Sequence, residues 1–64
     1  MKLIRLTSDK SVMRALIKGC EVVEVYNGRV TVLHCDSRGA IIDSHCNKFH
    51  INTSVAQYYK IKGV

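Results

Sequence analysis

The chain contains no proline and no tryptophan, a single phenylalanine, and only five acidic residues against ten lysines and arginines. Without proline, no segment is barred from a helix or a strand by a missing backbone N–H. No apolar run approaches the roughly 20 residues that a membrane-spanning helix needs. Residues 1–7, MKLIRLT, also lack the long apolar core of a signal peptide. We therefore expect a soluble, cytoplasmic protein with no membrane partner.

Cysteine is scarce, and its placement argues against both a disulfide framework and a metal centre. Three cysteines cannot all pair within one chain, which fits reduced thiols in a reducing compartment. Cys20, Cys35 and Cys46, with His45 or His50, could supply four zinc ligands, but no Cys-x-x-Cys or His-x-x-x-His spacing occurs. Cys46 would reach Cys35 only if residues 44–48 bend sharply. We expect packed thiols and no cofactor, with the metal alternative left open.

The sequence offers no convincing catalytic group. His34 and Cys35 are adjacent, and neighbouring residues of a strand point to opposite faces, so the imidazole cannot readily activate the thiol. A chain of 64 residues forms one domain at most, residues 1–64. Such a domain buries only about 60% of the surface that its unfolded chain exposes, which leaves little room for a deep pocket. We expect a non-catalytic protein.

The strongest structural pattern is a β-hairpin at Asn27-Gly28. Two β-branched runs flank this pair, and Asn-Gly is the preferred sequence of a two-residue hairpin turn. A two-residue loop fixes the register of both strands. Counting outward, the sequence predicts these facing pairs: Tyr26–Arg29, Val25–Val30, Glu24–Thr31, Val23–Val32, Val22–Leu33, Glu21–His34 and Cys20–Cys35.

Before the hairpin, alternation over residues 2–7 predicts a short strand. A helix over residues 10–18 follows, capped by Thr7 or Ser8 and ended at Gly19. Its apolar face is expected to hold four residues at helical spacing: Val12, Met13, Leu16 and Ile17.

After the hairpin, the sequence predicts a turn over residues 36–39 and a third strand over 40–43, with Cys35 facing Ala40. Residues 44–48 are expected to form a loop and 49–51 a short strand. The tail is ambiguous, because Asn52, Thr53 or Ser54 could cap a helix, whereas residues 51–61 also alternate as a strand would. We favour the helix slightly. The predicted class is α+β: an N-terminal strand, one helix, a three-stranded antiparallel meander and a short final helix or strand.

Positive charge is concentrated on both sides of the hairpin. Residues 1–20 carry a net charge of +4, residues 21–43 carry −2, and residues 44–64 carry +3 with no acid at all. Three cations recur every fourth residue on the predicted helix, and residues 58–62 near the C-terminus combine aromatic rings with lysines, as in surfaces that bind nucleic acids. Candidate nucleic-acid-binding residues are Lys10, Arg14, Lys18, Arg29, Tyr58, Lys60 and Lys62.

These patterns favour a small, basic accessory or regulatory protein that binds nucleic acid. The alternative is a modulator or inhibitor of a host enzyme, of the kind that phages and other mobile elements encode, which would bind one protein target through a sheet face or edge. The edges of so small a sheet are hard to cover, so a homodimer formed by edge pairing or helix packing is also expected.

Overall fold

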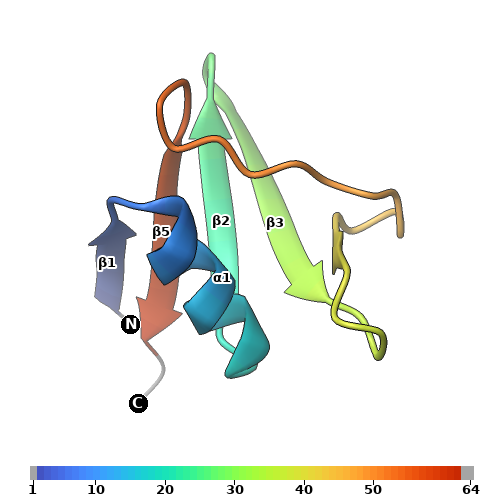
Figure 1. Ribbon diagram of the computed structural model, residues 1–64. Helices are drawn as coiled ribbons and strands as arrows, with labels where there is room; N and C mark the ends of the chain where they lie inside the picture. The colour runs from blue at the N-terminus through green and yellow to red at the C-terminus, as the bar shows by residue number, and fades with distance from the viewer. Residues whose placement is uncertain (1, 63–64) are drawn as a thin grey trace.

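The structure, a computed structural model, describes residues 2–62 (Figure 1). It has α+β architecture, as predicted: one helix lies on one face of a five-stranded sheet. No helix in the described part of the chain is long and apolar enough to cross a membrane. In chain order, the elements are β1 (Lys2–Leu6), α1 (Asp9–Ile17), β2 (Glu21–Tyr26), β3 (Arg29–Cys35), β4 (Ile41–Ile42) and β5 (Gln57–Lys62).

The strands lie in the order β1-β5-β2-β3-β4, so the last strand occupies the middle of the sheet. β5 is antiparallel to both β1 and β2, which makes β1 and β2 parallel to each other. Together β1, α1 and β2 form a split β-α-β unit, with β5 inserted into the gap. The sheet is thus larger than the three-stranded meander that we predicted.

The hairpin forms as the sequence predicts. β2 and β3 pair in the expected register from Tyr26↔Arg29 to Val22↔Leu33. Asn27 and Gly28 have φ values of 54° and 79°, and two consecutive positive φ angles are typical of a type I′ turn. The ladder ends at Val22↔Leu33, so the two outermost predicted pairs, Glu21–His34 and Cys20–Cys35, lie beyond it.

Helix α1 begins after Ser8, one of the two predicted caps, and ends at Ile17, one residue before the predicted end at Lys18. Ser8 is the N-cap: its hydroxyl accepts a hydrogen bond from the Ser11 N–H, while the Ser11 hydroxyl oxygen accepts from the Ser8 N–H. This reciprocal pair satisfies two backbone donors that a helix start leaves free. The buried face holds Val12, Ala15 and Leu16, whereas Ile17, expected on that face, is 69% exposed.

The connection from β3 to β4 corrects two predictions. Cys35 pairs with Ile41 and not with Ala40, because the Asp36 carboxylate accepts hydrogen bonds from the N–H groups of Arg38 and Ala40 and holds a five-residue loop. Residues 49–51 do not form a strand. Between β4 and β5, the described residues form one isolated bridge, which joins Ile42 to Lys48.

The C-terminal segment is a strand, so the helix that we favoured there is wrong. The Asn52 side chain accepts hydrogen bonds from the backbone N–H and the hydroxyl of Ser54, and its carbonyl accepts from Val55 and Ala56, so Asn52 begins a single turn that gives way to the strand at Gln57. β5 then pairs with β1 on one side and β2 on the other. Two ladders of backbone hydrogen bonds outweigh the local capping signal.

The core lies between α1 and the sheet. Its seven buried residues are Leu6, Val12, Ala15, Leu16, Val22, Leu33 and Tyr58, and partly buried side chains around them include Phe49, Ile51 and Ala56. The segment between β4 and β5 therefore covers the same face of the sheet as α1, where Figure 1 shows it crossing in front of β2 and β3.

We predict that Val22→Ala destabilises the fold by about 2 kcal/mol or more, because Val22 is 0% exposed and its truncation leaves a cavity. Val55→Ala is the matched control. Val55 is 62% exposed in a turn, so the same truncation should change the free energy of unfolding by less than about 0.5 kcal/mol. Urea denaturation followed by circular dichroism measures both values, and equal destabilisation by the two substitutions would contradict this core.

Candidate nucleic-acid interface

Helix α1 presents three cations on its outer side. Lys10, Arg14 and Lys18 are all exposed and recur every fourth residue, whereas the buried face holds Val12, Ala15 and Leu16. At 3.6 residues per turn, this spacing sets the cations in a row directed away from the core. The helix part of the predicted site is therefore present as a single surface.

Two lysines of the sheet join this row. Facing residues of paired strands share one face of a sheet. Lys60 lies opposite Ile4 of β1 and Val22 of β2, and Val22 is buried under α1, so Lys60 is on the helix side. Alternation along β1 places Lys2 on that side too, because Leu6 there is part of the core.

Because α1 packs against both β1 and β5, the helix cations and the sheet lysines lie on the same side of the sheet. We call the set Lys2, Lys10, Arg14, Lys18 and Lys60 the cationic surface. Lys62 lies opposite Lys2 in the β1–β5 ladder, which brings its backbone to the same corner; its side chain is outside what the structure describes.

The two acidic side chains on this side of the molecule are engaged in hydrogen bonds. The Asp9 carboxylate accepts from the backbone N–H of Thr53 at 3.0 Å and from its hydroxyl at 2.8 Å. These bonds, the hydroxyl one first, lower the pKa of Asp9. Glu24 accepts from the Tyr58 hydroxyl at 2.6 Å. Both carboxylates link separate segments of the fold: Asp9 joins α1 to the loop before β5, and Glu24 joins β2 to β5.

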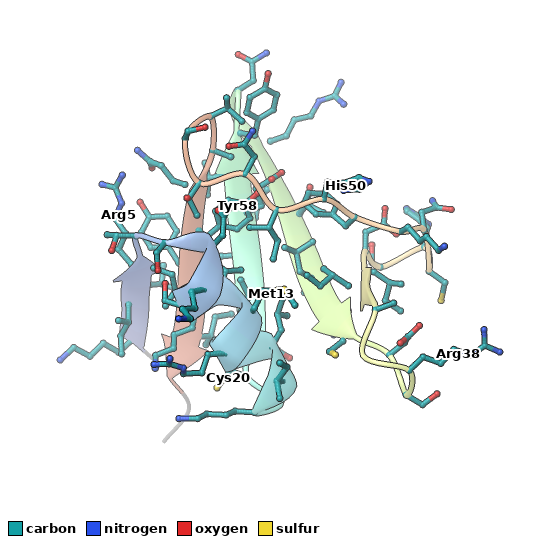
Figure 2. All side chains as sticks on the ribbon, viewed as in Figure 1. Arg5, Met13, Cys20, Arg38, His50 and Tyr58 are labelled. Carbon is teal, nitrogen blue, oxygen red and sulfur yellow. The ribbon has the colours of Figure 1, made fainter. Side chains whose placement is uncertain are left out.

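Tyr58 has to be withdrawn from the predicted site. Its side chain is 0% exposed in the core, beside β2 and the segment that leads into β5 (Figure 2), so no base can stack on its ring. Its hydroxyl donates to Glu24 and accepts from the Asn52 N–H at 2.9 Å. Burial, followed by the hydrogen bond to Glu24, raises the pKa of Tyr58 to about 12.

Arg29 lies far from Lys18, the last of the helix cations. It is exposed at the tip of the β2–β3 hairpin, opposite Tyr26. From there to the start of β2, where the chain has just left α1, the strand covers six residues, or about 20 Å at 3.3 Å per residue. Of the seven predicted residues, the structure thus gathers Lys10, Arg14, Lys18 and Lys60, and adds Lys2, which the sequence analysis did not select.

The cysteines and histidines do not converge. Cys20 and Cys35 are partly buried and pack against the core, whereas Cys46 is exposed in the turn that follows β4. The carboxylate of Asp43, whose pKa is lowered first by the Asn47 N–H, closes that turn. Among residues 2–62, no group of three His, Cys, Asp or Glu side chains is placed to hold a metal ion, and no pocket is present.

Comparison with known protein families, with curated proteins and with solved structures finds no match to this chain. Its functional surfaces must be read from its own residues.

We predict that Tyr58 titrates near pH 12, against about 10 for a free tyrosine. The raised pKa means that the neutral phenol contributes stability below pH 10, and that this contribution is lost as the pH rises toward 12. At 1.36 kcal/mol per pKa unit, the loss is about 2 to 3 kcal/mol.

Ultraviolet titration of tyrosinate absorbance, in the wild type and in Tyr58→Phe, isolates the curve of this one residue. Tyr26→Phe is the control, since Tyr26 is 50% exposed. Stability measured from pH 10 to 12 should fall more steeply in the wild type than in Tyr58→Phe. Parallel curves, or a Tyr58 midpoint near pH 10, would contradict the buried hydrogen bond.

Proposed function

We propose that this protein binds nucleic acid without catalysis, through the cationic surface. The observation that supports this is the convergence of five basic side chains, from β1, α1 and β5, on one side of the molecule. The carboxylates of Asp9 and Glu24 accept hydrogen bonds from Thr53 and Tyr58, so both are held in place by other parts of the fold.

The chemistry of the surface favours contacts to phosphates over contacts to bases. Lysine and arginine side chains neutralise phosphates and release counterions, which gives strong, salt-sensitive affinity with little dependence on sequence. Single-strand binding surfaces add aromatic rings on which bases stack. With Tyr58 in the core, the cationic surface has no such ring. A duplex, with its dense rows of phosphates, is therefore the preferred ligand.

We predict that the double substitution Lys10→Gln/Arg14→Gln weakens binding to a random-sequence duplex at least tenfold at low salt. Removing one phosphate-neutralising side chain should reduce the slope of log affinity against log salt by about 0.9 for duplex DNA, and removing both by about 1.8. Fluorescence anisotropy of labelled duplex DNA and RNA, and of single strands of equal length, across a salt series measures both the affinity and the slope.

The matched control is Arg38→Gln/Lys48→Gln, which removes two exposed charges from the turns around β4. Figure 2 shows Arg38 on the opposite side of the molecule from β1. This variant has the same net charge as the first one, so a purely nonspecific charge effect would weaken binding equally in both. Equal weakening, or no binding at low salt, would refute the proposal.

A protein target is the second candidate function, supported by one observation. β1 pairs only with β5 among the described strands, so its outer edge offers backbone groups to a partner strand. If this function holds, a tagged chain should recover one stoichiometric protein from lysate, and nuclease treatment should not release it. Release of every bound protein by nuclease treatment would leave nucleic acid as the sole proposal.

A further inference from the structure

The face of the sheet opposite α1 is apolar, and we call it the open face. Register assigns residues to it, because facing residues of paired strands share a side. In each strand, the residues of the open face alternate with those that point toward the core. The apolar members are Leu3, Val23, Val25, Val30, Val32, Ile42, Tyr59 and Ile61, and the polar ones are Arg5, Glu21, His34 and Gln57.

The apolar side chains are contiguous across the middle of the sheet. One row runs from Tyr59 to Val23 to Val32 through three neighbouring strands, and the pair Val25–Val30 lies beside it. Nothing in residues 2–62 covers them, because α1 and the segment between β4 and β5 both pack on the other face (Figure 1). Val30 is 66% exposed and Leu3 is 56% exposed.

The charges on the two faces show which partner fits. The open face carries one arginine, Arg5, and one carboxylate, Glu21, so it has no net charge with neutral His34. A strongly charged partner therefore gains nothing there. A second copy of this chain, with its net charge of +5, could approach on this side because the cationic surface lies on the opposite face.

The size of the open face agrees with a reversible contact. The five strands hold 5, 6, 7, 2 and 6 residues, so at about 3.3 Å per residue and a spacing of about 4.8 Å the face has a projected area of roughly 400 Å². This is the size of a functional apolar patch, and it lies below the roughly 800 Å² per partner of a standard stable interface. A dimer through this face should form and dissociate with concentration.

We infer that two copies of this chain associate through their open faces. The two sheets then pack about 10 Å apart as a sandwich, with Tyr59, Val23 and Val32 in the new core. The helices lie outside, and the two cationic surfaces face away from each other at a separation beyond the Debye length of about 8 Å at physiological salt. The dimer thus has one cationic surface on each of its two outer sides.

Sedimentation velocity of the full chain, free of nucleic acid, tests this inference from low micromolar to millimolar concentration. The mass should rise with concentration from 7.2 kDa toward twice that value. Val23→Lys, which places a charge in the centre of the open face, should keep the protein monomeric. Val55→Lys is the matched control: it adds the same charge at an exposed turn and should leave dimerisation unchanged.

Circular dichroism reports whether Val23→Lys still folds. If it does not, Val32→Thr tests the same face. Threonine is nearly the same size as valine and should keep the fold, but its hydroxyl should raise the dimer dissociation constant about tenfold. A monomer at every concentration overturns the inference. So does a dimer that neither open-face variant weakens, which would indicate pairing through β1. Because no nucleic acid is present, failure here leaves the proposed function untouched, and failure of nucleic-acid binding leaves this result standing.

Discussion

The pairing of β5 with β1 on one side and β2 on the other is the interaction on which the rest of the molecule depends. Without β5, a gap one strand wide separates β1 from the β2–β3 hairpin, and α1 has no continuous surface to cover. β5 also carries Tyr58 into the core, where the phenol bonds to Glu24 of β2 and to the Asn52 backbone. A single strand thus supplies sheet continuity, the largest core side chain and the anchor of the preceding loop.

This arrangement separates the two faces of the sheet by chemistry. On one side, α1 covers the core and the cations gather around it; on the other, valines and isoleucines lie partly exposed. The separation follows from the alternation of side chains along a strand, since Lys60 and Tyr59 are adjacent in sequence and face opposite ways. The two proposals use different faces, so one copy could serve both at once.

Local signals in the sequence predicted the parts of the fold that are held by local interactions. Asn27-Gly28 determined its turn and five facing pairs, and Ser8 capped the helix that follows it. The predicted partner of Cys35 was wrong by one residue. The Asp36 carboxylate closes a loop one residue longer than the predicted turn, so Cys35 pairs with Ile41. Such a difference depends on a side-chain hydrogen bond that pattern alone does not reveal.

The errors in the tail and in the site have a common cause. Whether Tyr58 belongs to a helix, an exposed strand or the core depends on the positions of β1 and β2, and the sequence places neither in space. For the same reason, the sequence showed the alternation of residues in β1 but not that β1 pairs with β5. Lys2 therefore could not be assigned to the helix side of the sheet, where Lys60 lies. The helix row needed only the 3.6-residue period and was therefore predictable.

The central position of the last strand also shapes how this molecule reaches its native state. The β2–β3 hairpin closes over two residues and can form in microseconds, whereas β1 and β5 pair the two ends of the described chain, Lys2 with Lys62. Until β5 docks, both strands that flank its place keep unpaired backbone groups and an uncovered apolar surface. We expect the chain to be most prone to aggregation in this interval, which ends when the C-terminal strand docks.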